Sequence, residues 1–269
     1  MGMNDPANLI LKIERYLGQH EEMYGNVAFE IQDVKSELQE SASDTVLVDN
    51  FDPLFLEYSD DAQPITTISD SVEMKNPNLD HINTLDELRE LCKVTPELHT
   101  DLEGTNLVFG TGDPNADLMI IGEAPGAEED KRGEPFVGRS GQLLTKILEA
   151  INFSRDQVFI ANILKHRPPD NRNPSPAERK RSLPYLMKQI DLVNPKIILC
   201  LGKVSAETLL GKSSSMKDMR GTFHKFSEKY ELLVTYHPAA LLRNPNWKRD
   251  TWEDVKVLRN RYDELGCKP

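Results

Sequence analysis

Short apolar runs alternate with segments of helical periodicity from about residue 107 to the end of the chain. Continuous apolar runs are typical of strands buried on both faces of a parallel sheet. Such strands are predicted at 116–122, 157–164, 195–202 and 230–236. Helices are predicted between and after them, at 140–151 (with Ser140 as N-cap), 181–193, 203–211 and 246–266. This alternation predicts an α/β fold, a three-layer α/β/α sandwich around a four-stranded, mostly parallel sheet.

The first part of the chain, residues 1–82, lacks this alternation. A short amphipathic helix is predicted at 7–18. The sequence after it is acidic and rich in Ser, Thr and Asp, which is typical of a largely disordered linker. An apolar island at 45–58 is either a docking segment or a chance cluster in that linker. We therefore expect an acidic, partly disordered N-terminal extension over 1–82 and a catalytic domain over 83–269.

The catalytic domain is predicted to begin with a helix at 84–93. Thr84 occupies the N-cap position, and Glu87 stands three residues later, where a capping box needs it.

The net charge of −12 argues at first against a nucleic-acid partner, because phosphate binding needs a basic face. That value averages two unlike parts. Residues 1–100 carry 21 acidic and 6 basic side chains, whereas residues 101–269 carry 23 and 26. The acidity therefore resides in the N-terminal part and does not exclude DNA as a partner of the rest.

Three cysteines lie far apart, at Cys92, Cys200 and Cys267, and form no CxxC pair. This spacing does not suggest a disulfide framework. No apolar run approaches the roughly 20 residues that a membrane-spanning helix needs. We expect a reducing, cytoplasmic setting without membrane association.

Polar residues follow the predicted strands. Glu123 comes directly after the first strand, Asn162 interrupts the second, and His237 follows the fourth. Because the carboxyl ends of parallel strands meet at one edge of a sheet, these groups should converge on one crevice. Phe136, in the glycine-rich "GEPFVG" stretch, is expected to join them.

Three segments make the pattern specific: "GEAPGAEEDKRGEPFVGRSGQLL", "NILKHRPPDNRNPSP" and "HPAALLRNP", in this order. Together they strongly resemble the family 4 uracil-DNA glycosylases of bacteria and archaea, over about residues 84–266. The resemblance implies a monofunctional enzyme that flips uracil out of DNA. It would hydrolyse the N-glycosidic bond with water as nucleophile and so initiate base excision repair.

The residue types agree with this chemistry. The Phe136 ring can stack on a flat pyrimidine, and the Asn162 amide offers an acceptor and a donor that suit N3–H and O4 of uracil. By resemblance, Glu123 positions or activates the water and stabilises a cationic sugar, and His237 donates a hydrogen bond to uracil O2. The predicted catalytic residues are Glu123 and His237. The predicted substrate-binding residues are Gly122, Ala124, Phe136 and Asn162.

The expected DNA contacts come from two places. Leu241 and Leu242 would enter the minor groove as a wedge, with Arg243 at the backbone, although the leucines could instead pack inward on a helix. The basic loop 165–181 would contact phosphates, chiefly through Lys165, Arg167 and Arg172.

Family 4 enzymes typically hold a [4Fe–4S] cluster on four cysteines. The corresponding positions of this chain are Cys92, Thr95, His166 and Ser182. Because thiolates normally hold the irons, we expect neither the cluster nor any other metal or cofactor. Thr95, His166 and Ser182 are expected to fill the space with hydrogen bonds.

Two other functions stay open at this point. One is a glycosylase for another deaminated base, such as hypoxanthine. The other is a catalytically weak DNA- or protein-binding module of the same fold, against which the intact Glu123, Asn162 and His237 argue. The acidic extension could dock a repair or replication protein through 7–18 or shield the basic face as a DNA mimic. We expect a monomer.

Overall fold

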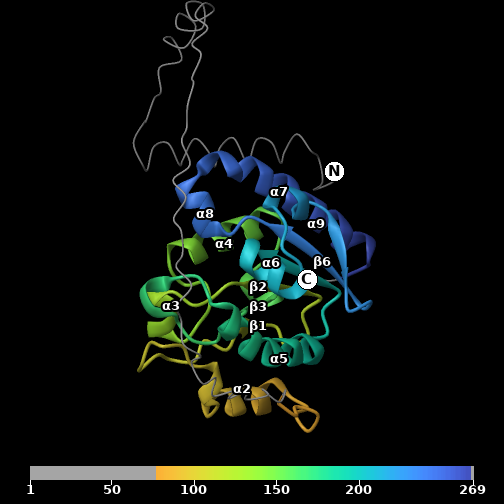
Figure 1. The fold of residues 1–269 in the computed structure, drawn as a ribbon. Coiled ribbons are helices and arrows are strands. Elements are labelled where there is room, and N and C mark those ends of the chain that lie inside the picture. The colour runs from red at the N-terminus through yellow and green to blue at the C-terminus, as the bar shows by residue number, and fades with distance from the viewer. Residues whose placement is uncertain (1–76, 268–269) are drawn as a thin grey trace, which may run out of the picture. The chain divides into compact units, whose positions relative to one another are not determined.

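The structure is a computed structural model that describes residues 77–267 (Figure 1). The helix predicted at 7–18 and the acidic linker up to residue 76 lie outside the described residues, whereas Leu79 and Ile82, predicted to belong to the linker, are buried in the core. The first described helix, α2 (Leu85–Lys93), begins where predicted. The Glu87 amide donates to Thr84 Oγ1 at 3.1 Å, and the Thr84 amide donates to Glu87 Oε2 at 3.2 Å, so the capping box is confirmed.

A six-stranded sheet in the order β1-β3-β2-β4-β6-β5 forms the centre of the fold. Its four inner strands are parallel and match the predicted ones: β2 (Leu118–Gly122), β3 (Phe159–Asn162), β4 (Ile197–Leu201) and β6 (Tyr230–Thr235). The predicted count of four is wrong, because antiparallel strands β1 (Thr111–Gly112) and β5 (Phe223–Phe226) extend both edges. With two residues, β1 is too short to give a pattern, and β5 is only partly buried and lacks an apolar run.

Helices cover both faces of the sheet. They are α3 (Ala127–Arg132), α4 (Arg139–Ala150), α5 (Pro176–Val193), α6 (Lys203–Leu210), α7 (Met216–Met219), α8 (Pro238–Arg243) and α9 (Lys248–Glu264). Short 3-10 turns are η1 (Pro96–Leu98), η2 (Arg155–Gln157), η3 (Pro169–Asn171) and η4 (Pro245–Trp247). None of the helices within 77–267 is long and apolar enough to cross a membrane.

Two apolar cores confirm the three-layer sandwich. Met119 and Ile121 of β2 face a core shared with α2, α5, α6 and α7, whereas Leu118 and Ile120 face a core shared with α4 and α9. In Figure 1, α2 and α5 accordingly lie below the strands, and α4 and α9 lie above them. Every residue of β2 and β4 is buried, as the continuous apolar runs predicted.

Two helix starts differ from the prediction. The N-cap of α4 is Gly138 rather than Ser140. Helix α5 begins at Pro176, ahead of the predicted residue 181, because Ser175 and Glu178 form a second capping box. This earlier start places the basic residues 179–181 on a helix instead of in a loop.

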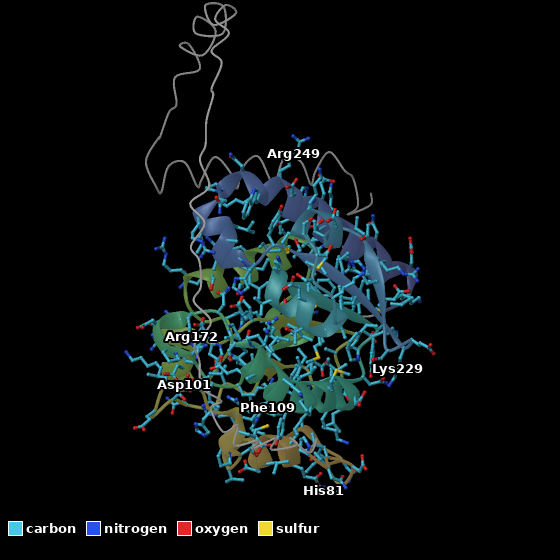
Figure 2. All side chains as sticks on the ribbon, viewed as in Figure 1. His81, Asp101, Phe109, Arg172, Lys229 and Arg249 are labelled. Carbon is cyan, nitrogen blue, oxygen red and sulfur yellow. The ribbon has the colours of Figure 1, made fainter. Side chains whose placement is uncertain are left out.

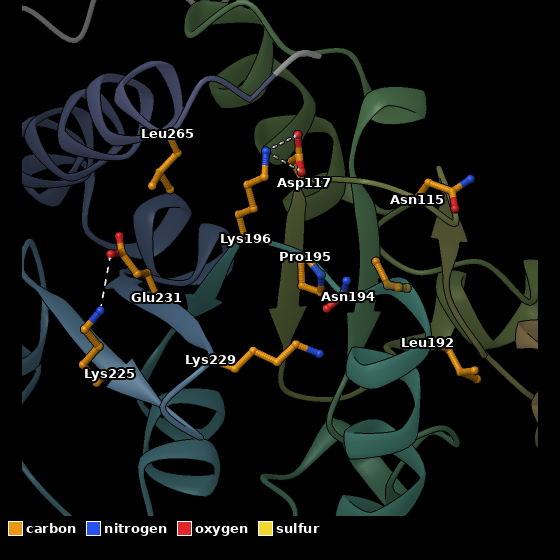
Figure 3. Close-up of a pocket in the computed structure, with 11 residues that line it drawn as sticks. Asn115, Asp117, Leu192, Asn194, Pro195, Lys196, Lys225, Lys229, Glu231 and Leu265 are labelled. Carbon is orange, nitrogen blue, oxygen red and sulfur yellow. Dashed lines mark hydrogen bonds and ion pairs between the residues drawn. The ribbon is translucent and has the colours of Figure 1, made fainter. Parts of the chain in front are cut away.

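The strand order places a topological switch point at the carboxyl edge of the sheet, where α/β folds bind ligands. From β2 the chain passes to β3 on one side and later to β4 on the other, and such a reversal opens space beside the strand ends. A separate pocket lies at the opposite, amino edge (Figure 3). Ion pairs Lys196–Asp117 (3.4 Å) and Lys225–Glu231 (3.7 Å) line that pocket, and none of the predicted site residues lies there.

Candidate active site

Gly122, the last residue of β2, brings two predicted site residues together. A Cβ atom at this position would lie 2.4 Å from Asn162 Oδ1 and 2.5 Å from Phe136 Cζ. Asn162 is the register partner of Gly122 on β3, and both Asn162 and Phe136 are buried. The missing side chain at Gly122 therefore lets the amide and the ring meet at the strand end.

The Phe136 backbone is held in an unusual conformation. Its φ of 54° is in the left-handed region, which costs a residue with a side chain of order 1 kcal/mol or more. Arg155 donates to Pro135 O at 2.8 Å and to Phe136 O at 3.1 Å. Gly141 permits the turn, because a Cβ there would lie 1.9 Å from Phe136 O. Sequence reasoning missed Arg155, since nothing near it in the sequence refers to Phe136.

Glu129 holds the other half of the same loop. Its Oε1 accepts hydrogen bonds from the Val137 amide at 2.9 Å and from the Gly138 amide at 2.8 Å. These amides stand at the start of α4, where a carboxylate also interacts favourably with the helix dipole. Arg155 and Glu129 thus bind four consecutive backbone groups around Phe136.

Asn162 offers an unused acceptor. Its Oδ1 is buried and has no hydrogen-bond partner within residues 77–267. An unsatisfied buried polar atom costs about 1–3 kcal/mol, so a ligand N–H in this place would regain that free energy.

Lys165 does not contact DNA as predicted. Its side chain is fully buried, and its ammonium donates to Asn162 O at 2.9 Å, to Phe109 O at 3.5 Å and to Gln189 Oε1. Burial lowers the pKa of Lys165 to about 8. The prediction of a phosphate contact is wrong, because the residue packs beneath the end of β3 and holds the Asn162 backbone.

His237 follows β6 and is the N-cap of α8. Its Nδ1 accepts a hydrogen bond from the Ala239 amide at 3.2 Å. Burial, and then the charge of Arg243, lower the pKa of His237 to about 4. The ring is therefore neutral at pH 7, and since Nδ1 accepts, its proton resides on Nε2. The His237 and Phe136 ring centroids lie 5.5 Å apart.

Glu123 is half-buried directly after Gly122, with Ala124 beside it. Burial raises the pKa of the Glu123 carboxyl, and the positive charges of Arg179 and Arg243 oppose that rise. Arg179 Nε is buried without a hydrogen-bond partner among the described residues. The carboxylate therefore lies in a partly dehydrated place next to two cations. Arg179, in the first turn of α5, had been taken only for a phosphate contact.

The two leucines of α8 differ in burial. Leu241 is buried at 1% exposure, so its prediction as a wedge is wrong, whereas Leu242 is 41% exposed. Neighbouring residues of a helix point about 100° apart, so one faces the core while the other faces solvent. Arg243 is exposed beside Leu242.

The basic stretch 165–181 is less free than predicted. Arg172 pairs with Glu178 at 2.7 Å and with Asp101 at 3.3 Å, and Figure 2 shows Arg172 near Asp101. These two carboxylates occupy its guanidinium, which argues against Arg172 as a phosphate contact. Arg167 is half-buried and donates to Asn171 Oδ1 at 2.8 Å.

The positions that correspond to cluster cysteines are filled by bonded side chains. Thr95 Oγ1 donates to Leu91 O at 2.7 Å, and Ser182 Oγ donates to Ile163 O at 2.6 Å. Burial raises the pKa of the Cys92 thiol to about 11, so its thiolate is disfavoured.

His166 occupies the remaining one of these four positions. Its Nδ1 hydrogen-bonds Thr105 Oγ1 at 3.0 Å, and its ring stacks on His99 at 4.0 Å. In the part of the chain that the structure describes, no group of three or more His, Cys, Asp or Glu side chains could hold a metal ion. This donor set does not fit an iron–sulfur cluster.

Comparisons with known proteins agree with the geometry. A family model described as the uracil DNA glycosylase superfamily matches residues 109–256. The type-4 uracil-DNA glycosylase of Sulfurisphaera tokodaii is 48% identical over 174 residues, which cover 61% of this chain and 77% of that protein. The type-4 uracil-DNA glycosylase of Pyrobaculum aerophilum is 39% identical, over 65% of this chain and 92% of that protein. The type-4 enzyme of Thermotoga maritima is 38% identical, over 68% of this chain and 99% of that protein.

Proposed function

Because this chain belongs to the type-4 uracil-DNA glycosylases of the uracil-DNA glycosylase superfamily, we propose that it hydrolyses the N-glycosidic bond of deoxyuridine in DNA. The observation that carries the proposal is the unpartnered, buried Oδ1 of Asn162 beside the Phe136 ring. A flipped uracil would stack on that ring and donate its N3–H to that oxygen.

Base selection follows from the Asn162 amide. Uracil presents a donor at N3 and an acceptor at O4, which match the amide oxygen and amide nitrogen. Cytosine presents the reverse pattern and would leave buried groups unpaired, which is how a polar pocket rejects a close analogue strongly. Hypoxanthine carries the same donor and acceptor pair as uracil, so it belongs in the assay.

The two catalytic groups act on opposite partners of the breaking bond. As the bond between C1′ and N1 breaks, its electron pair stays with the base, and neutral His237 donates Nε2–H toward O2 where charge develops. Ionised Glu123 orients the attacking water and stabilises the cationic sugar. The water oxygen bonds to C1′, its proton passes to Glu123 or solvent, and solvent protonates the uracil anion.

We also propose that the enzyme works without an iron–sulfur cluster. The support is chemical: one buried thiol, two hydroxyls and an imidazole, each hydroxyl already hydrogen-bonded to a backbone carbonyl. Purified protein should be colourless, contain no stoichiometric iron and keep its activity in the presence of a chelator. Activity that follows iron content would contradict this. We further propose that the enzyme acts on DNA as a monomer in the cytoplasm.

The test is release of base from oligonucleotides that contain uracil, hypoxanthine or cytosine. We expect release from uracil, and Glu123→Gln should lower kcat by at least 100-fold, as expected for loss of an acid–base group. Glu128→Gln changes an exposed carboxylate of the same segment and should leave kcat unchanged. No uracil release by folded wild-type protein would contradict the proposal.

A further inference from the structure

An aromatic stack adjoins the catalytic histidine. Tyr236 directly precedes His237, and its ring stacks on that of Trp247, with centroids 4.7 Å apart and planes at 13°. Trp247 ends η4, the turn that follows α8, and 38% of it remains exposed. A large aromatic ring that contacts the residue preceding His237 is therefore open to solvent.

Arg220 and Asp254 hold the aromatic stack in place. The Arg220 guanidinium lies over the Tyr236 ring at 5.5 Å, and it donates to both carboxylate oxygens of Asp254, at 3.1 and 2.8 Å. Asp254 is buried and also accepts from Thr235 Oγ1 at 2.7 Å. The sheet, Arg220 and Tyr236 thus hold Trp247 on a fixed support. A preorganised ring loses little conformational entropy when a ligand stacks on it.

Positive charge surrounds the exposed ring. Arg243, Lys248 and Arg249 are all exposed, and none of them forms an ion pair within 4 Å in residues 77–267, although the charge of Arg243 also acts on Glu123. Figure 2 shows Arg249 pointing away from the body of the molecule. The exposed Leu242 lies on the preceding helix. Aromatic rings among unpaired basic residues are typical of surfaces that bind single-stranded nucleic acid.

We propose that Trp247 is a stacking platform for a nucleobase next to the uracil on the same DNA strand, with Arg243, Lys248 and Arg249 at the flanking phosphates. Extrusion of uracil leaves its neighbours without a stacking partner, and the exposed indole supplies one. The platform needs no complementary strand, so the enzyme should act well on single-stranded DNA. This inference rests on the proposed function.

Fluorescence tests the stacking without catalysis. The chain has two tryptophans, so Trp252→Phe leaves Trp247 as the sole indole. A single-stranded oligonucleotide without uracil should quench its emission saturably, whereas an oligonucleotide of abasic spacers should not. Equal quenching by both, or none by either, would overturn the proposal. Because no base is released, this result does not depend on whether the protein cleaves uracil.

Kinetics test the position of the base. Trp247→Ala should raise KM for single-stranded uracil DNA about tenfold with kcat unchanged, the size expected for one base–aromatic contact. Trp247→Phe should retain most of the affinity. Val257→Ala, an equally exposed apolar residue of α9, is the control.

Spacer substrates separate stacking from mere support of Tyr236. With abasic spacers on both sides of the uracil, wild type and Trp247→Ala should show the same KM. A loss of kcat, or an equal loss of affinity on spacer and normal substrates, would show that Trp247 only braces His237 and would overturn the proposal. A loss that requires a base in the complementary strand would also overturn it. Absence of uracil release by wild type would contradict the proposed function instead.

Discussion

Single residues at this site are tuned by their surroundings more than by their type. Glu123 and His237 have their pKa values moved in opposite directions, and burial is the first cause of both shifts. The carboxyl gains protons more easily than usual, while the imidazole loses its proton more easily. Arg243 disfavours the charged imidazole and favours the charged carboxylate, so one cation supports both working states.

The pH dependence of kcat should reflect Glu123. The carboxylate works ionised, so activity falls as pH drops through its raised pKa, and no step should appear near pH 6.5, the usual pKa of histidine. Arg179→Gln removes a charge that favours the carboxylate, so the acid limb should move to higher pH. Lys180→Gln, an exposed neighbour on α5, should leave the limb in place. An unmoved limb in Arg179→Gln would separate Arg179 from Glu123.

At this scale the sequence singled out residues only where position alone was informative. Asn162 stood out because it interrupts an apolar run, and His237 because it follows one. Lys165 appeared as part of a basic run, but its ammonium is enclosed by three oxygens, two of which come from distant segments. Arg155 gave no signal, and Arg179 appeared only as part of the basic stretch 165–181, because only folding brings these residues to Phe136 and Glu123.

At the level of elements, the loop between α3 and α4 determines where the stacking ring lies. Arg155 and Glu129 bind the two halves of this loop through hydrogen bonds to its backbone. They are positioning residues. Their effect should therefore appear in binding of the base rather than in the chemistry.

Arg155→Gln should raise KM about tenfold, since hydrogen bonds from a charged donor contribute about 1.5–3 kcal/mol. It should also weaken competitive inhibition by free uracil, while affinity for undamaged DNA stays unchanged. Arg155→Lys should recover part of the loss, and Asp156→Asn, next in sequence and exposed, should have no effect. Unaltered inhibition by uracil in Arg155→Gln would contradict the role.

A second element-scale prediction concerns the packing around His166. His166→Ala removes a buried ring stacked on His99 and a hydrogen bond to Thr105, so it should lower the free energy of unfolding by about 2 kcal/mol. A domain of this size should then melt roughly 4–8 °C lower. His81→Ala, in an exposed turn, is the control. An unchanged melting temperature would show that His166 does not replace the support a cluster gives.

Elements differed in how far sequence could predict them. The inner strands were found because they are buried on both faces and therefore apolar throughout. The edge strands β1 and β5 were missed, because an edge strand needs no continuous apolar run. The start of α5 was misplaced, although Ser175 and Glu178 carried the capping signal.

On the scale of the whole molecule, the separation of charge is the feature with most consequence. Residues 1–82 carry 17 acidic and 4 basic side chains, and the remaining chain supplies the basic contacts. A tethered excess of negative charge repels DNA phosphates most when salt screens it least.

Deletion of residues 1–76, which spares the buried Leu79 and Ile82, should therefore tighten DNA binding several-fold at low salt, with the difference vanishing at high salt. Fluorescence anisotropy with uracil-free DNA at 50 and 300 mM salt would measure this, and both proteins should have the same kcat. Equal affinity at both salt concentrations would instead favour a role in docking a repair or replication protein. The two-part organisation at residue 82 stays a prediction from sequence.

Helix α8 joins events that are usually considered separately. Its N-cap is His237, whose ring is held by the Ala239 amide, and Leu242 projects from its other end. One six-residue helix joins the two, so entry of Leu242 into the groove, as predicted from the sequence, would fix the position of the imidazole at the same time. Entry of Leu242 into the DNA and placement of the His237 imidazole beside the base would then be coupled. A free nucleoside offers Leu242 no groove to enter, so its N-glycosidic bond would remain intact.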